Sequence, residues 1–184
     1  MIDPRVKRVE GPNLILRLIT PGDAEYVHSL RIDPAYNQHL SEVRGTAEDQ
    51  RRWIESYKIR EAEGLEFYDI IERKDSRPCG VVRLYDLADD SFTWGSWILD
   101  GNKPAKAALE SAVLSFGVGF GLLDLETAHV DARIDNEHAQ AFYRRLKMIE
   151  THKSQTDIFF IYSRQQYELD CNRYMTLLSG KDAV

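Results

Sequence analysis

The sequence predicts a mixed α/β (α+β) domain: a central, mostly antiparallel sheet of six to seven strands, flanked by helices on both faces. Three observations predict this class. Short β-rich runs alternate with amphipathic helical segments. Three of these runs follow one another with only turn residues between them, as in an antiparallel meander. Beyond the meander, helices and strands alternate, which is typical of a sheet covered on both faces.

The first part of the chain predicts one strand and two helices. Residues 14–19 form a short apolar run that is typical of a strand. Thr20 follows as a helix N-cap with proline at the first helical position, and this helix ends before Pro34. Residues 35–45 are polar and irregular. Thr46 then caps a second helix.

The middle of the chain predicts the meander. Residues 66–73, 79–85 and 92–99 are rich in β-branched and aromatic side chains, with turn residues between the runs. In the third run, strand alternation predicts that Trp94 and Trp97 point to opposite faces of the sheet. At least one of these two rings is then part of the core.

The last part of the chain alternates helices and strands. Apolar side chains at three- and four-residue steps predict helices here, and β-branched runs predict strands. The predicted elements are a helix over 107–123, a strand over 128–134, a helix over 139–146, paired strands over 148–153 and 157–163, and a helical tail over 165–178. We interpret residues 1–184 as one domain, with a core over about 12–165 and a C-terminal tail over 165–184.

Composition excludes several classes of protein. The formal net charge of −6 argues against broad attraction to nucleic acid or to an anionic membrane surface. Cys79 and Cys171 provide neither a disulfide framework nor the spacing of metal ligands. The first residues contain no apolar segment like that of a secretory signal, and the stretch 107–125 is too polar to span a bilayer. We therefore expect a cytoplasmic protein.

Residues 92–148 resemble the core of the GNAT acetyltransferases. Asn136, Ala139 and Tyr143 have the spacing of that family's Asn-x-x-Ala-x-x-x-Tyr motif. The stretch Ala108-Leu109-Glu110 stands where the family often has Ala-Thr-Glu. The order of elements agrees over nearly the whole chain. The resemblance implies the GNAT fold, nearest to the branch that acetylates ribosomal proteins and amino sugars.

The resemblance implies an enzyme that transfers acetyl from acetyl-CoA directly to a primary amine in a ternary complex, with no metal. Tyr143 then serves as the general acid for the departing thiolate. A backbone N–H at the end of the third meander strand stabilises the carbonyl oxygen. The residues implied in acetyl-CoA binding are Ile98, Leu99, Asp100, Lys103, Pro104, Ala105, Lys106, Ala107, Asn136, Ala139, Phe142 and Tyr143.

The phosphate-binding stretch departs from the family pattern. Pro104 and Lys106 replace its two glycines, and proline removes one backbone donor. The N-terminus of the following helix supplies free N–H groups and a favourable dipole for an anion. Lys103 and Lys106 can add positive charge there.

No motif identifies the group that takes the proton from the attacking amine. The candidates for this base, or for the acceptor site, are His39, Glu42, Asp86 and Asp131. Water can also accept this proton.

The acceptor is a small-molecule amine in the interpretation that we favour. The sequence around residues 30–55 is similar to acetyltransferases that act on nucleotide-linked amino sugars in bacterial surface-glycan pathways, pseudaminic acid synthesis included. A protein N-terminal amine, as in the ribosomal-protein branch, is the alternative acceptor. A non-catalytic acyl-CoA-binding domain is an alternative of another class, because both loop glycines are missing. A homodimer is the default expectation within the family.

Overall fold

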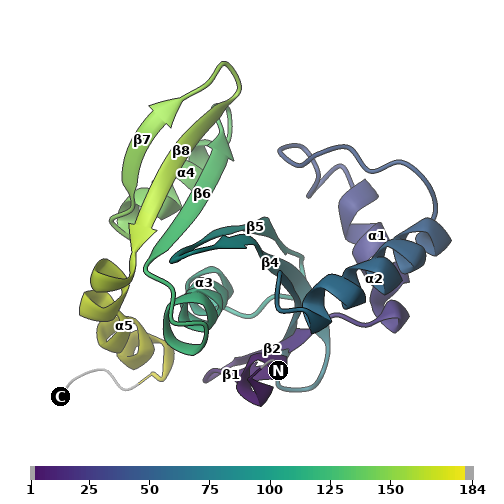
Figure 1. Ribbon diagram of the computed structural model, residues 1–184, viewed down its shortest axis with the longest axis horizontal. Coiled ribbons are helices and arrows are strands. Elements are labelled where there is room, and N and C mark those ends of the chain that lie inside the picture. The colour runs from purple at the N-terminus through teal and green to yellow at the C-terminus, as the bar shows by residue number, and fades with distance from the viewer. Residues whose placement is uncertain (1–2, 181–184) are drawn as a thin grey trace.

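An eight-stranded sheet forms the centre of the computed structural model, which describes residues 3–180 (Figure 1). The strand order is β1-β2-β3-β4-β5-β6-β8-β7, and every neighbouring pair is antiparallel except β5–β6. The strands are β1 (Arg8–Glu10), β2 (Leu14–Leu18), β3 (Phe67–Arg73), β4 (Pro78–Ala88), β5 (Ser91–Leu99), β6 (Thr127–Arg133), β7 (Ile149–Lys153) and β8 (Asp157–Ser163). The α-helices are α1 (Ala24–Ile32), α2 (Ala47–Ala62), α3 (Ala107–Gly117), α4 (Glu137–Arg145) and α5 (Arg164–Leu178).

The mixed, mostly antiparallel sheet with helices on both faces confirms the predicted fold class. The predicted number of strands, six to seven, is wrong by one. The additional strand is β1, whose three residues pair with β2 at one edge of the sheet. A segment this short and polar has no alternation that a sequence pattern could detect, so β1 depends on its partner strand.

Two 3-10 turns and one π-helical turn complete the chain. They are η1 (Pro4–Lys7), η2 (Pro21–Asp23) and η3 (Val118–Leu122). The helix start predicted at Thr20 begins as η2, where the Asp23 carboxylate accepts hydrogen bonds from the backbone N–H and the hydroxyl of Thr20. The second predicted cap, Thr46, forms a capping box with Asp49. No helix within residues 3–180 combines the length and the apolar character that a membrane span requires.

Helices α1 and α2 cover one face of the sheet. Val27, Leu30, Ile54 and Tyr57 pack against β3 and β4 and form one hydrophobic cluster with them. The Tyr57 hydroxyl accepts a hydrogen bond of 2.7 Å from the backbone N–H of Tyr68, so α2 is also tied to the sheet by a polar contact.

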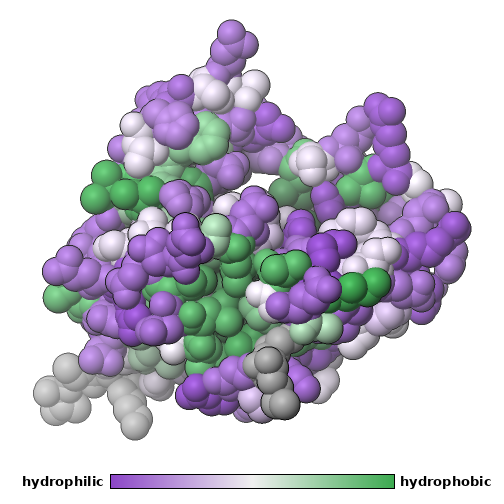
Figure 2. Space-filling model, viewed as in Figure 1, coloured by the Kyte–Doolittle hydropathy of each residue, from purple (hydrophilic) through white to green (hydrophobic). Residues whose placement is uncertain are grey.

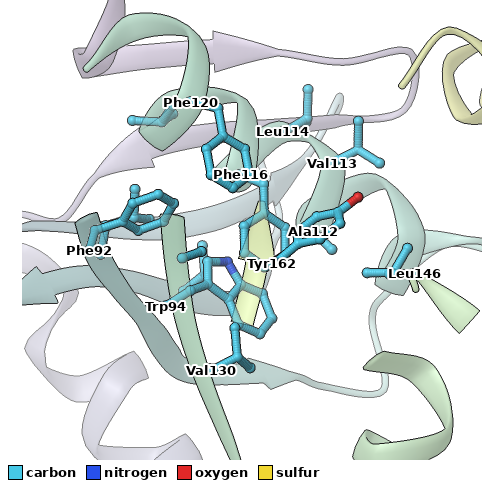
Figure 3. Packing of buried hydrophobic residues seen from close by; sticks show 14 of the residues in the cluster. Phe92, Trp94, Ala112, Val113, Leu114, Phe116, Phe120, Val130, Leu146 and Tyr162 are labelled. Atoms are coloured by element: carbon cyan, nitrogen blue, oxygen red, sulfur yellow. The ribbon is translucent and has the colours of Figure 1, made fainter. Parts of the chain in front are cut away.

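Helices α3, α4 and α5 cover the other face, where the larger core lies. Figure 3 shows Trp94 at its centre, close to Phe116 on α3 and Tyr162 on β8. The Trp94 and Phe116 rings stack at 4.8 Å between centroids, and the edge of Tyr162 meets Phe116 at 5.0 Å. Aromatic pairs of this kind add to the stabilisation from burial, so α3 and β8 are fixed on the same part of the sheet.

The two tryptophans of β5 lie on the same face, so the prediction of opposite faces is wrong. Their ring centroids are 5.0 Å apart. The register with β4 shifts between Val81 and Arg83, and Ser96 adopts the left-handed conformation with φ of 49°. This β-bulge inserts one residue into β5. The side chain of Trp97 therefore points to the same face as Trp94, and not to the opposite face that strict alternation predicts.

Glu110, in the first turn of α3, joins this helix to the start of β2. The carboxylate is fully buried and accepts hydrogen bonds from the backbone N–H groups of Asn13 (2.7 Å) and Leu14 (2.8 Å) and from the Asn13 amide (2.9 Å). A buried carboxylate needs such partners, and Glu110 has three. The resulting link fixes the N-terminal end of α3 relative to the sheet.

Candidate active site

Strands β5 and β6 form a fork. They pair only where Ser91–Thr93 meet Thr127–His129, although β5 continues to Leu99 and β6 to Arg133. Figure 1 shows β6, β8 and β7 turning away from β4 and β5. The space-filling view shows a hollow between this diverging part and the segment that joins α1 to α2 (Figure 2). Backbone groups that would otherwise pair across the sheet therefore border the gap.

Tyr143 lies where the two strands separate. Its ring meets Trp94, the first residue of β5 beyond the paired segment, edge-on at 6.1 Å, and it meets Phe160 of β8 edge-on at 5.5 Å. The side chain is 6% exposed. Among the described residues, none forms a hydrogen bond with the Tyr143 hydroxyl, which leaves this donor available for a ligand.

The environment of Tyr143 keeps its hydroxyl protonated. Burial raises the pKa of this phenol well above its usual value, and the charges of Asp131 and Tyr85 raise it further. Of these two charges, that of Asp131 has the larger effect.

Asp131 and Asp86 line one cavity of about 280 Å³ beside the fork. We call this cavity the carboxylate pocket. Its walls come from the ends of β4 and β5 and from β6, β7 and β8. The residues that line it are Tyr85, Asp86, Thr93, His129, Val130, Asp131, Thr151, His152, Phe159 and Phe160.

The two carboxylates reach the carboxylate pocket for different reasons. Asp131 alternates with buried Val130 and Ala132 on β6, so it faces away from the α3–α5 core. Burial raises the pKa of Asp131, Asp157 adds to this effect and Arg133 opposes it. Asp86 lies at an irregularity of β4 and has a left-handed φ of 49°. Strained backbone of this kind often occurs at functional sites.

His39 and Glu42 lie elsewhere, in the segment between α1 and α2. The His39 ring nitrogen Nδ1 is 3.2 Å from an Asp135 carboxylate oxygen, although the angle does not meet hydrogen-bond geometry. Glu42 is exposed and pairs with Arg44 at 3.2 Å. The four candidate bases thus divide into a pair in the carboxylate pocket and a pair outside it. The contact of His39 with Asp135 joins the segment between α1 and α2 to the turn after β6.

The backbone at the end of β5 points one N–H group into the fork. Asp100 N–H donates to the Cys79 carbonyl on β4 at 2.9 Å. Successive residues of an antiparallel strand direct their N–H groups to opposite sides, so Ile98 also faces β4. Leu99 therefore directs its N–H away from β4, toward the side from which β6 has departed.

The turn between β5 and α3 leaves several backbone donors free. Ala107 N–H bonds to the Pro104 carbonyl at 3.3 Å, and Glu110 N–H bonds to the Lys106 carbonyl at 3.0 Å. No described residue accepts a hydrogen bond from the N–H groups of Ala105, Lys106, Ala108 and Leu109. These donors lie at the positive end of the α3 dipole, which is a favourable site for an anion.

The side chains of this turn have mainly structural partners. The buried Asp100 carboxylate accepts hydrogen bonds from the Tyr26 hydroxyl at 2.8 Å and the Asn102 N–H at 2.7 Å. The Lys103 ammonium is 3.4 Å from the Asp100 carbonyl. The Lys106 ammonium donates at 2.8 Å to the Leu177 carbonyl, near the C-terminal end of α5. In this arrangement the backbone N–H groups, and not Lys106, present the positive potential of the turn.

The residues of the Asn/Tyr motif position α4. The Asn136 side-chain oxygen caps the helix by accepting from the Ala139 N–H at 3.1 Å. Its amide N–H groups have no acceptor among the described residues. The Phe142 ring packs at 5.2 Å against Trp97 beyond the β-bulge, so α4 is tied to the far part of β5.

Sequence reasoning missed several residues that build the site. Ser115 and Ser111 on α3 accept hydrogen bonds from the indole N–H groups of Trp94 (2.8 Å) and Trp97 (3.1 Å). Gln140 on α4 donates to the Arg133 and Ile134 carbonyls and fixes the turn after β6. Alternation around buried Leu84 could have placed Tyr85 on the open face. Within residues 3–180, no three His, Cys, Asp or Glu side chains are grouped so as to hold a metal ion.

Comparisons with known proteins agree with this geometry. The family described as "Acetyltransferase (GNAT) domain" matches residues 13–149. The solved structure of apo FdhC, described as a nucleotide-linked sugar GNAT, is 34% identical with a TM-score of 0.86, over 93% of this chain and 98% of FdhC. No curated protein sequence matches the chain.

Two more distant structures share the fold. A chimera of spermidine N-acetyltransferase SpeG from Vibrio cholerae and hSSAT is 17% identical with a TM-score of 0.73, over 84% of this chain and 98% of the chimera. The ribosomal-protein-S5-alanine acetyltransferase from Vibrio fischeri is 13% identical with a TM-score of 0.73, over 87% of this chain and 98% of that protein. At these identities the likeness concerns the fold alone.

Proposed function

This chain belongs to the GNAT acetyltransferase family and is an acetyl-CoA-dependent N-acetyltransferase, and we propose that its acceptor is a nucleotide-linked amino sugar. The observation that carries this proposal is the similarity to FdhC, at 34% identity over 93% of the chain. The carboxylate pocket supports it, because the two carboxylates that line it suit a primary ammonium group.

Acetyl-CoA supplies an activated acetyl group, and the residues around the fork fit this co-substrate. The free N–H groups of Ala105, Lys106, Ala108 and Leu109 suit its diphosphate. The gap between β5 and β6 suits its extended arm, with the Asn136 amide available beside it. Leu99 N–H is the donor that we assign to the carbonyl oxygen, because the N–H groups of Ile98 and Asp100 face β4.

We assign the proton-transfer roles to Asp131 and Tyr143. Asp131 accepts the proton that the amine loses as its nitrogen bonds to the acetyl carbon. The raised pKa of Asp131 makes it a stronger base than an ordinary aspartate. Tyr143 donates its hydroxyl proton to the sulfur as the carbon–sulfur bond breaks. Its hydroxyl is protonated and has no hydrogen-bond partner among the described residues, as this role requires.

A panel of amine acceptors tests the proposal. We expect release of free CoA from acetyl-CoA with nucleoside-diphosphate amino sugars at a much higher kcat/KM than with spermidine or with a peptide bearing a free N-terminal amine. A preference for spermidine or for the peptide would contradict the proposed acceptor and leave the acetyltransferase activity intact.

A further inference from the structure

A second cavity, of about 340 Å³, adjoins the carboxylate pocket. We call it the arginine groove. It is lined by Arg60, Leu65, Glu66, Arg83, Tyr85, Asp86 and Leu87. Tyr85 and Asp86 line both cavities, so the two are neighbours along the end of β4. A ligand whose amine occupies the carboxylate pocket can therefore extend into the arginine groove.

A buried carboxylate fixes both arginines of the groove. Glu66 is 4% exposed, and its two oxygens bind different partners. One accepts from Arg60 Nε, and the other accepts from Arg83 Nε at 2.8 Å and from Arg83 Nη2. Arg60 Nη2 and Arg83 Nη1 bond to none of the described residues. Each guanidinium therefore keeps one N–H₂ group free while its position is held.

Aromatic rings support the same two guanidinium groups. The Arg83 guanidinium lies 4.7 Å from the Tyr85 ring centroid and 5.3 Å from that of Trp53. The Arg60 guanidinium is 5.7 Å from the Trp53 ring centroid. Cation–π contacts restrict the side chains, so less conformational entropy is lost when a ligand binds.

The charged side chains are distributed unequally between the two cavities. Arg60 and Arg83 place positive charge beside Glu66 at the α2 end, whereas Asp86, where the cavities meet, and Asp131 give the carboxylate pocket negative charge. A matching ligand carries a cationic amine at one end and an anionic group farther along. A polyamine, which is cationic throughout, does not match the α2 end. A nucleoside-diphosphate amino sugar matches both ends, because its diphosphate follows the sugar.

We propose that the arginine groove binds the diphosphate of the acceptor, with Arg60 Nη2 and Arg83 Nη1 donating to its oxygens. This assignment rests on the proposed nucleotide-linked acceptor and adds the residues that recognise it. Arginine suits such a site because its planar donors match phosphate oxygens. The groove then determines acceptor specificity and takes no part in acetyl transfer.

The preference for a diphosphate-bearing acceptor tests this assignment. We compare kcat/KM for a nucleoside-diphosphate amino sugar with kcat/KM for the same amino sugar without the nucleotide. In Arg60→Gln the ratio of the two should fall by about 10- to 100-fold, as expected for loss of a charge-assisted hydrogen bond. The KM for acetyl-CoA should change little. Arg52→Gln, on an exposed part of α2, is the matched control and should keep the ratio.

Arg83 needs a paired substitution, because it donates two of the three hydrogen bonds that the buried Glu66 carboxylate accepts, whereas Arg60 donates one. The double variant Glu66→Gln/Arg83→Gln removes both charges together and should also lower the ratio. An equal loss toward both acceptors would overturn the assignment and indicate a structural role. An unchanged ratio in a folded variant would equally overturn it.

Direct binding separates this assignment from the proposed function. Calorimetry with uridine or thymidine diphosphate, at saturating CoA so that the CoA site is filled, should show binding to the wild type. Binding should weaken by about 10-fold or more in Arg60→Gln. If the enzyme acetylates nucleotide amino sugars but the arginine variants bind the diphosphate normally, the groove assignment fails alone. If spermidine is the preferred acceptor and neither diphosphate binds, both proposals fail.

Discussion

Asp69 makes the stability of this protein depend on pH in a direction opposite to that of most carboxylates. It lies on β3 between Leu18 of β2 and Val82 of β4 and is 1% exposed. One of its oxygens, Oδ1, has no hydrogen-bond partner among the described residues. Burial raises the pKa of Asp69 from 3.8 to about 8, and the charge of Glu61 adds to this while Arg17 and Lys58 oppose it.

The sign of the effect follows from proton binding. Because the folded-state pKa exceeds the unfolded one, the folded protein holds a proton that the unfolded chain releases between these two values. The stability that this proton provides is fully present below the pKa of Asp69 in the unfolded chain. It is lost as the pH rises toward the pKa of Asp69 in the folded protein. The loss is about 1.4 kcal/mol for each pH unit, or about 3 kcal/mol between about pH 5 and pH 7.

The substitution Asp69→Asn removes this dependence, because an amide does not ionise. The difference in the free energy of unfolding between variant and wild type should shift in favour of the variant by about 2 to 3 kcal/mol from about pH 5 to pH 7. Urea unfolding followed by tryptophan fluorescence measures it. Asp75→Asn, in the turn between β3 and β4, controls for the removal of a carboxylate. A difference that is equal at both pH values would refute the reasoning.

Substitutions at three further positions test the site and the turn before α3. Tyr143→Phe should lower kcat by about 100-fold with little change in the KM for acetyl-CoA, since general acids typically contribute this much, and equal turnover would remove Tyr143 from that role. Asp131→Asn should lower kcat/KM by a similar factor of about 100 and abolish the acidic limb of its pH profile, which in the wild type reflects the raised pKa of Asp131. Lys106→Gly should unfold at a higher temperature than Lys106→Met. Both lose the bond to Leu177, but only glycine relieves about 1 kcal/mol of left-handed strain, and equal melting temperatures would contradict this.

The order of the elements could be predicted from the sequence because its signals are local. The hydrogen bonds that cap the helices at Thr20 and Thr46 join residues within four positions of one another. The apolar periodicity of α3 likewise predicts a helix without knowledge of what the helix packs against. The β-bulge at Ser96, in contrast, is not a local signal, because it is defined by the register of β5 against β4. No periodicity within β5 indicates it, and so the faces of Trp94 and Trp97 could not be predicted.

The same distinction explains the catalytic candidates. A motif of fixed spacing identified Asn136 and Tyr143, whereas His39, Glu42, Asp86 and Asp131 carried no spacing that related them to Tyr143. Their separation into two pairs depends on strand order, because β4 and β6 both approach the fork only when each lies next to β5. Alternation with buried Leu84 could have placed Tyr85 on the open face of β4, but only the strand order places it beside β6.

The turn that lacks both family glycines shows how a substitution can keep a backbone path and add a contact. Lys106 adopts a φ of 63°, in the left-handed region that favours glycine, so the turn keeps the conformation for which glycine is suited. A residue with a Cβ pays about 1 kcal/mol in this region. The bond from the Lys106 ammonium to the Leu177 carbonyl offsets a similar amount, because it satisfies a carbonyl at the negative end of α5. Through this bond, Lys106 ties the turn that carries the free N–H groups at the start of α3 to α5. A glycine at this position has no side chain that could make such a bond.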